Sequence, residues 1–433
     1  MENKTYKLLI IALYMLLLLS LLLGCSSDNK TKTGKSNSSK TSTESNTLNN
    51  ESKVNVTVGD NSDTLNGNTP AKPTTPNTTP TVNPNASGAK NAVSSITSTP
   101  STAKPKSIPA VNVTNIDSFK SAVIVNLSQG KDIAINLHEL YTKDNIADKV
   151  MKVIETSGYA GYVSGIQYSI VNNVAYIYFQ YKGGSASFLT KSSAVDTTVS
   201  SIVNKTITDN MSDYDKELAL HDYLVNNVAY DYANLVKNTI PEDSYTAYGA
   251  LVKGVAVCEG YAEAMHKLLT LAGVDNYIIN GFGDGVAHQW NLVNIQGGIY
   301  HLDATFDDPI STSGQVITHN YFNVNDVQIS KNHTWNSADY PKSTAVVANY
   351  YTFNKLLASN KSKYYEIIKN QLIKKNPVIS IKTSSYDPKT YTSDALLKVL
   401  KDNKGIDYVD MTSGYSFSYD PDSSVIEIGV NYK

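Results

Sequence analysis

Cys258, His288 and Asp303 are the residues whose types and order in the chain suit covalent acyl transfer. Cys258 follows a turn-rich segment and begins a run, residues 258–272, in which apolar side chains recur at helical spacing; Gly273 ends the run. A thiol in the first turn of a helix lies at the positive end of the helix dipole, which favours the thiolate form. The position therefore suits a nucleophile better than a cysteine that only packs as a small apolar group.

Three strand-like runs follow the predicted helix, at residues 276–280, 288–295 and 299–306. His288 begins the second run and Asp303 lies in the third. A cysteine at a helix N-terminus, a histidine on one strand and an acid on the next form a nucleophile, a base and a residue that orients the base. We expect the sulfur, imidazole and carboxylate to meet in a water-accessible cleft.

The turn between the last two runs decides which acid can reach His288. A two-residue turn at Gln296-Gly297 places Asp303 on the diagonal next to His288, about 7–8 Å away between Cα atoms and within side-chain reach. A turn one residue later would place Asp307 opposite His288 instead. The residues alone leave both acids open as the orienting group.

Three short blocks in this region resemble the transglutaminase-like family, a papain-related fold shared by transglutaminases, peptide N-glycanases and some cysteine proteases. The resemblance extends roughly from Met211 to Pro309. Its blocks are Val257-Cys258-Glu259-Gly260-Tyr261-Ala262, His288-Gln289-Trp290-Asn291 and His301-Leu302-Asp303-Ala304-Thr305.

The resemblance implies an α+β fold, in which the helix that carries Cys258 packs on an antiparallel sheet. It favours Asp303 over Asp307 and implies a Cys thioester formed from protein or peptide amides, without a cofactor. From position alone, we expect Trp290 to pack beside the triad near the substrate, and Tyr248 to stabilise an oxyanion together with the Cys258 N–H.

Other residues that could do chemistry are interpreted as structural. His221 and His266 fall in predicted helices, and His301 is interpreted as a packing histidine. The acids before Pro309, Asp307 and Asp308, are weak support for a cation site, so no metal is expected.

The composition of the chain excludes some classes of binding partner and some kinds of site. The net charge is -2 at pH 7, which gives no electrostatic basis for binding nucleic acid. The chain has 2 cysteines, which excludes a disulfide framework and a cysteine-rich metal site.

The first 25 residues have the pattern of an export signal, with an apolar run that ends in Leu22-Leu23-Gly24-Cys25. These four residues resemble a bacterial lipobox, which implies acylation of Cys25 and a location on the outer face of the cytoplasmic membrane. An uncleaved N-terminal anchor is the alternative. Residues 26–110 are rich in Ser, Thr, Asn and Pro and are predicted to be a disordered tether, with ends about 50 Å apart on average.

Three folded regions are expected after the tether. Residues 111–205 are predicted to form a small α/β module with an Asn172-Asn173 hairpin turn, and residues 206–340 the catalytic core. Residues 351–433 repeat the order helix, strand, helix and hairpin, and are interpreted as a second copy of the small module.

The sequence therefore predicts a membrane-tethered cysteine acyltransferase or amide hydrolase that acts on proteins or peptides. Two alternatives stay open. One is a cysteine peptidase acting on cell-wall or surface peptides, and the other is a non-catalytic surface adhesin or scaffold that uses the same fold.

Overall fold

The computed structural model describes residues 56–58, 93, 95–103, 105–309 and 317–433. The predicted export signal, Cys25 and most of the predicted tether lie outside these residues. No helix in the described ranges has the length and apolar content that a membrane span requires.

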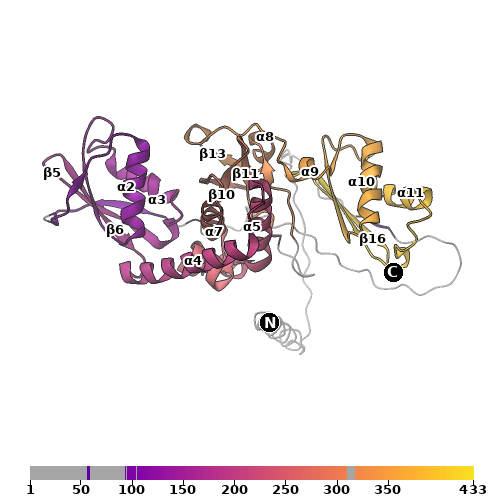
Figure 1. Ribbon diagram of the computed structural model, residues 1–433, viewed down its shortest axis with the longest axis horizontal. Coiled ribbons are helices and arrows are strands. Elements are labelled where there is room, and N and C mark those ends of the chain that lie inside the picture. The colour runs from indigo at the N-terminus through magenta and orange to yellow at the C-terminus, as the bar shows by residue number, and fades with distance from the viewer. Residues whose placement is uncertain (1–55, 59–92, 94, 104, 310–316) are drawn as a thin grey trace, which may run out of the picture. The chain divides into compact units, whose positions relative to one another are not determined.

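The first α/β region is a sheet with the strand order β2-β5-β6-β4-β3, and helices α2 and α3 lie along it (Figure 1). The predicted hairpin turn is confirmed: Asn172 and Asn173 both have positive φ, 50° and 61°, as a two-residue turn requires. Strand β2 lies within the segment that the sequence assigned to the tether, and it pairs in parallel with β5. The elements are β2 (Thr97–Pro100), β3 (Ala110–Val111), α2 (Ile116–Ser128), β4 (Ile133–Asn136), α3 (Ile146–Glu155), β5 (Val163–Val171) and β6 (Val174–Tyr181).

Helix α4 (Gly184–Thr206) follows this sheet and was not expected from the sequence. It is rich in Ser and Thr, which are weak helix formers. Its buried side chains Phe188, Val195, Val199 and Ile202 nevertheless recur at helical spacing. Packing of this stripe against α7 outweighs the poor intrinsic propensity.

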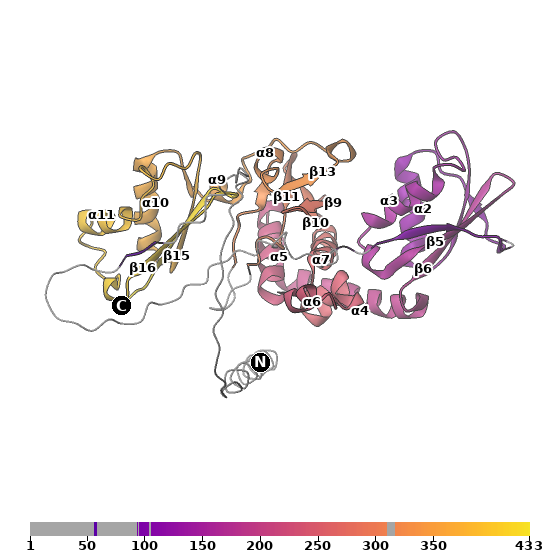
Figure 2. The same ribbon diagram turned by 180° about the vertical axis from the view of Figure 1, so that it is seen from behind.

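The central region is an antiparallel sheet with the strand order β12-β11-β10-β9-β13, against which α7 packs (Figure 2). This arrangement confirms the predicted α+β core with a cysteine-bearing helix on an antiparallel sheet. Its main elements are α5 (Asp213–Asn227), β7 (Ala229–Tyr230), β8 (Val255–Ala256), α7 (Cys258–Leu271), β9 (Asn276–Gly283), β10 (Val286–Ile295), β11 (Gly298–Leu302), β12 (Phe322–Val324) and β13 (His333–Trp335).

Helix α7 is buried along most of its length, which fixes its position on the sheet. Tyr261, Met265, Leu268 and Leu269 are at most 1% exposed, and burial of each such side chain contributes roughly 1.5–3 kcal/mol. In its first turn, a Cβ on Gly260 would lie 2.8 Å from the Ser244 carbonyl oxygen, so only glycine allows this approach. The start of the helix, and with it Cys258, is therefore held against the preceding loop.

The last region is a second sheet, with the strand order β1-β16-β17-β15-β14. In both α/β sheets, a short strand runs parallel to the strand that lies between the two helices, and the final hairpin completes the sheet. This shared topology matches the repeated order seen in the sequence; a common origin by duplication stays a prediction. The elements are β1 (Val56–Val58), β14 (Leu357–Ala358), α10 (Lys361–Ile373), β15 (Val378–Thr383), α11 (Ala395–Asp402), β16 (Tyr415–Asp420) and β17 (Val425–Val430).

Glu217, a buried acid on α5, should make the stability of the central region depend on pH. Its carboxyl accepts a hydrogen bond from Asn323 Nδ2 at 2.7 Å. Burial outweighs that bond and raises the pKa of Glu217 to about 8. Between its ordinary pKa, about 4.3, and pH 8 the folded state therefore holds a proton that the unfolded state has lost. Stability from this group falls as pH rises, by at most about 1.4 kcal/mol per pH unit.

In Glu217→Gln this contribution is absent, so unfolding free energy should fall less steeply between pH 5 and pH 8 than in the wild type. Urea unfolding followed by tryptophan fluorescence measures it, because both tryptophans of the chain, Trp290 and Trp335, lie in the central sheet. Equal slopes for the two proteins would show that Glu217 is ionised when folded.

Candidate active site

Cys258 is the first residue of α7, as the sequence predicted. Val257 precedes the helix in an extended conformation, with φ -99° and ψ -179°. Its N–H donates to the Ser244 carbonyl at 2.8 Å, and its own carbonyl accepts the first helical bond, from Tyr261 N at 3.1 Å. The sulfur therefore lies at the N-terminal end of the helix, where the backbone N–H groups have no partner within the helix and the helix dipole is positive.

The β10–β11 turn has the first of the two registers that the sequence allowed. Ile295 pairs with Gly298, and the turn residues Gln296 and Gly297 have positive φ, 53° and 83°. His288 Nε2 then lies 2.6 Å from Asp303 Oδ2. The alternative acid, Asp307, instead lies 3.3 Å from the Nε2 of His221.

Asp303 follows β11 in a turn rather than lying inside a strand, because β11 ends at Leu302. Its Oδ1 accepts hydrogen bonds from the backbone N–H groups of Thr305, at 3.0 Å, and Phe306, at 3.1 Å. Its Oδ2 faces His288 and His333. Burial opposes ionisation, but the charge of His288 and its hydrogen bond outweigh burial and hold the pKa of Asp303 well below its usual range. The carboxylate is thus ionised and fixed in orientation.

His288 sits between this carboxylate and the cysteine. Burial works against its protonation, but the Asp303 carboxylate and the Cys258 sulfur outweigh burial and raise the pKa of His288 to about 10. Because Nε2 faces Asp303, Nδ1 is the ring nitrogen left to exchange a proton with the sulfur. The arrangement favours an imidazolium held between the Asp303 carboxylate and the Cys258 sulfur.

His333 belongs to the site, although no pattern in the sequence pointed to it. Strand β13 pairs with β9 so that His333 lies opposite Gly283, which brings its Nε2 to 3.1 Å from Asp303 Oδ2. Burial lowers the pKa of His333 despite the nearby carboxylate. A neutral ring carries one N–H, and the two ring nitrogens face Asp303 Oδ2 and, at 2.7 Å, Asn332 Oδ1, so the tautomer of His333 decides whether Asp303 receives that hydrogen bond.

Trp290 packs beside the imidazole, with ring centroids 5.8 Å apart and an interplanar angle of 19°. Its Nε1 donates to His301 Nδ1 at 2.9 Å, which places His301 in a packing role. Trp290 is 1% exposed. The Trp290 side chain therefore forms a buried wall beside His288, as expected. It has almost no exposed surface for direct contact with a substrate, which differs from the expectation that it lies near the substrate.

Tyr248 does not take the expected position beside the sulfur. Its ring lies 5.8 Å from Lys191 Nζ and 5.6 Å from Lys253 Nζ. The loop that leads to Cys258 turns the side chain toward these lysines. Instead, Tyr230 and Tyr245 pack against the cluster that contains Cys258. Burial, with the nearby sulfur and Asp303, raises the pKa of Tyr230 well above its ordinary value, so its hydroxyl stays protonated.

The expectation of a water-accessible cleft at the sulfur is wrong. Cys258 is 0% exposed, because apolar side chains that include Val93, Leu235 and Ile240 pack around it. The adjoining cavity of about 290 Å³ is lined by His288 and Glu259 and also by Val93. The site is therefore open at the imidazole and covered at the sulfur.

Residues 200–304 match the model of the transglutaminase-like superfamily. No curated protein matches the chain significantly.

Solved structures that resemble the chain do so distantly. One is a transglutaminase (15% identity, TM-score 0.24, 40% of this chain and 50% of the other covered). Another is a candidate cysteine protease from Cytophaga hutchinsonii (16% identity, TM-score 0.23, 35% of this chain and 46% of the other covered). A third is an arylamine N-acetyltransferase from Bacillus cereus (12% identity, TM-score 0.20, 25% of this chain and 48% of the other covered). That enzyme is described as having a unique Cys-His-Glu catalytic triad. The chain spans half or less of the length of each.

The matched residues contain the helix that begins at Cys258, the strand that carries His288 and the turn residue Asp303. Residues 200–304 are thus similar to the transglutaminase-like superfamily, and the match includes all three residues of the candidate triad.

Proposed function

We propose that the protein is a cysteine acyltransferase or amide hydrolase that acts on protein or peptide amides through a Cys258 thioester. The observation that carries the proposal is the 2.6 Å contact between His288 Nε2 and Asp303 Oδ2. This contact fixes the tautomer and orientation of an imidazole whose other nitrogen serves the cysteine.

In the first half-reaction, the Cys258 sulfur attacks the amide carbonyl and forms a C–S bond. The carbonyl oxygen becomes an oxyanion, and backbone N–H groups at the start of α7 can stabilise it. Collapse of the tetrahedral intermediate breaks the C–N bond, and His288 gives its proton to the leaving nitrogen. Ammonia or an amine departs, and the thioester remains.

In the second half-reaction, an acceptor attacks the thioester carbonyl and His288 takes the acceptor's proton. Collapse of this second tetrahedral intermediate breaks the C–S bond and returns the Cys258 sulfur as the thiolate beside the protonated His288. An amine acceptor yields a new amide, which cross-links the two substrates, whereas water yields the acid. The apolar cover over Cys258 limits the access of water, which favours amine acceptors once a substrate occupies the site. Peptide hydrolysis is the same chemistry with a peptide bond as donor and water as acceptor.

Burial of the sulfur also supports a second candidate function, a scaffold that does no chemistry. A cysteine at 0% exposure is what an inert packing residue would show. Such a scaffold gives no reason for the contacts of Asp303 with both His288 and His333. We therefore favour the enzyme.

We also propose that the protein is tethered to the outer face of the cytoplasmic membrane through a lipid on Cys25. The part of the 26–110 segment that does not belong to β1, to β2 or to the packing around Cys258 would then let the domain reach neighbouring surface proteins or wall peptides. Support comes from the apolar run that ends at Cys25 and from the composition of the segment.

Cys258→Ala should lower turnover by at least about 10³-fold, because the covalent route is lost. The assay incubates the protein with a glutamine-containing peptide and a labelled primary amine, and measures both ammonia release and label incorporation. His266→Ala, on the same helix, is the matched control and should keep turnover within a few-fold. Equal turnover in wild type and Cys258→Ala would rule out the thioester.

The pH dependence of kcat/KM should report the proton on His288. Because the pKa of His288 is about 10, the ring stays protonated, and able to act as the acid, up to that pH. Asp303→Asn removes the negative group that favours the proton, so the alkaline fall in kcat/KM should move toward the ordinary histidine pKa, about 6.5. The rate itself should drop about 10³–10⁴-fold. An alkaline limb that stays in place would mean that His288 is not the titrating acid.

Thinning the cover over the sulfur should speed its reaction with a small reagent. Val93 packs against the Cys258 cluster and also lines the adjoining cavity, so Val93→Ala opens a path to the sulfur. Alkylation of Cys258 by iodoacetamide, followed by mass spectrometry, should become several-fold faster. Val125→Ala, at a side chain that is 48% exposed, is the control. An unchanged rate would place the route to the sulfur elsewhere.

A further inference from the structure

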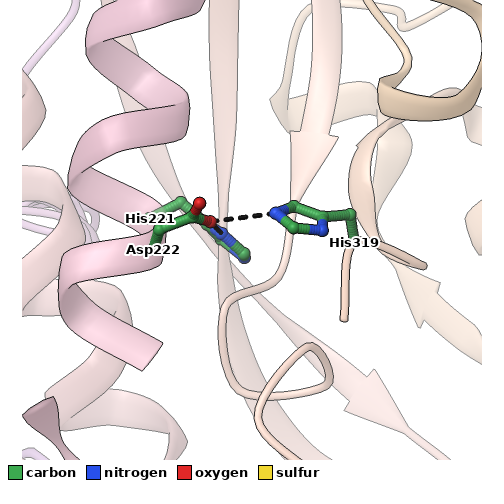
Figure 3. A group of neighbouring side chains, drawn as sticks. All are labelled: His221, Asp222 and His319. Carbon is green, nitrogen blue, oxygen red and sulfur yellow. Dashed lines mark hydrogen bonds and ion pairs between the residues drawn. The ribbon is translucent and has the colours of Figure 1, made fainter. Parts of the chain in front are cut away.

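A second group of side chains, His221, Asp222 and His319, gathers around one carboxylate away from the triad (Figure 3). His221 Nδ1 lies 3.0 Å from Asp222 Oδ1. His319 Nε2 lies 2.9 Å from the same oxygen. Their donor atoms lie within 4.8 Å of one another.

The fold holds these side chains from two separate segments. His221 and Asp222 are neighbours on α5, whose start is fixed by a Ser212 capping box. His319 precedes β12, and its ring stacks on Tyr350 with centroids 3.8 Å apart and an interplanar angle of 5°. Both rings are therefore positioned by packing as well as by the carboxylate between them.

The outer face of His221 has the environment of a metal-bound histidine. Its Nδ1 faces Asp222, while its Nε2 lies 3.3 Å from Asp307 Oδ2. Both of these outer atoms are buried and make no hydrogen bond of good geometry. A histidine that binds a metal through one nitrogen almost always directs the other toward a carboxylate or carbonyl, which orients the ring.

Solvent can reach the group from one side. The His221 side chain is 0% exposed, whereas Asp222 is 38% and His319 is 14% exposed. An ion arriving from solvent would meet Asp222 and His319 first and would keep a coordination position open to water.

We propose that His221 Nδ1, the Asp222 carboxylate and His319 Nε2 bind a divalent transition-metal ion, with zinc the best fit and water as the fourth ligand. Two imidazoles and one carboxylate suit zinc, nickel or copper, whereas calcium and magnesium prefer ligand sets made of oxygen. Tetrahedral zinc, with bonds of about 2.0–2.1 Å, separates its ligand atoms by about 3.3 Å. Each ring nitrogen now lies within a few tenths of an ångström of that spacing from Asp222 Oδ1, at 3.0 Å for His221 and 2.9 Å for His319.

The ion would act as a structural clamp near the orienting acid. Asp307, which faces His221, donates its backbone N–H to the Asp303 carbonyl at 3.2 Å. It also accepts a hydrogen bond from Tyr321 N at 3.0 Å. Joining α5 to His319 would therefore brace the turn that positions Asp303. The sequence analysis expected no metal, and no local pattern links Asp222 to His319, which lies 97 residues later.

The test titrates chelator-treated, dialysed full-length protein with Zn²⁺ by isothermal titration calorimetry. One equivalent should bind, and Co²⁺ in its place should give the intense visible absorption of a tetrahedral site. His319→Gln keeps a hydrogen-bond donor for Asp222 but removes the imidazole, so its Kd should rise at least about 100-fold. Asp222→Asn should weaken binding in the same direction. If His319→Gln does not fold, as judged by circular dichroism without metal, Asp222→Asn serves alone.

His333→Ala is the matched control, because His288, Asp303 and His333 form the other group of possible ligands among the described residues. His333→Ala and Cys258→Ala should bind Zn²⁺ as tightly as the wild type. Binding lost in either of these variants but kept in His319→Gln and Asp222→Asn would place the ion at the triad and overturn the proposal. No binding by the wild-type protein would equally overturn it, and would leave Asp222 as a hydrogen-bond bridge.

Discussion

The candidate site depends on one buried charge contact, the 2.6 Å approach of His288 Nε2 to Asp303 Oδ2. Two opposite charges out of water are stable only when geometry and further hydrogen bonds compensate for the lost hydration. Here the carboxylate accepts hydrogen bonds from the backbone N–H groups of Thr305 and Phe306, and the ring of His333 lies 3.1 Å from its other oxygen. The imidazole has Asp303 on one side and the cysteine on the other. Each of these contacts thereby compensates part of the hydration that the buried charged groups lose.

Register is the structural condition for this contact. Moving the two-residue turn from Gln296-Gly297 to Gly297-Gly298 would shift the pairing of β10 with β11 by two residues, which would keep each side chain on its face but set Asp307 opposite His288. The observed turn keeps the two acids apart. Asp303 orients the imidazole, while Asp307 lies against His221 on the side of the proposed metal site. The turn from Asp303 to Asp307 therefore supplies one acid to the triad and one to the side of the proposed metal site.

The sequence could predict what depends on local pattern. Helix α7, the Ser212 cap of α5 and the Asn172-Asn173 hairpin have strong local signals: a Gly-terminated apolar stripe, a capping serine and a two-residue asparagine turn. The pairing of His288 with Asp303 followed from strand alternation together with the family resemblance.

What the sequence missed depends on contacts between distant segments. His333 reaches Asp303 only because β13 pairs with β9 and forms the edge of the sheet there. Val93 packs against the Cys258 cluster from a segment 165 residues earlier, and no periodic pattern in the sequence predicts a contact over that separation. Helix α4 forms although its composition disfavours helix, because its apolar stripe packs against α7. The His221, Asp222 and His319 group likewise arises only when β12 folds back toward α5.

The protonation state of His288 tests the account most directly. ¹⁵N NMR of protein labelled at histidine, recorded at pH 8 and assigned by comparison with His288→Gln, separates an imidazolium from a neutral ring. We predict an imidazolium with both nitrogens protonated, held by Asp303 and the cysteine. A neutral His288 ring at that pH would contradict the ion pair on which the proposed chemistry rests.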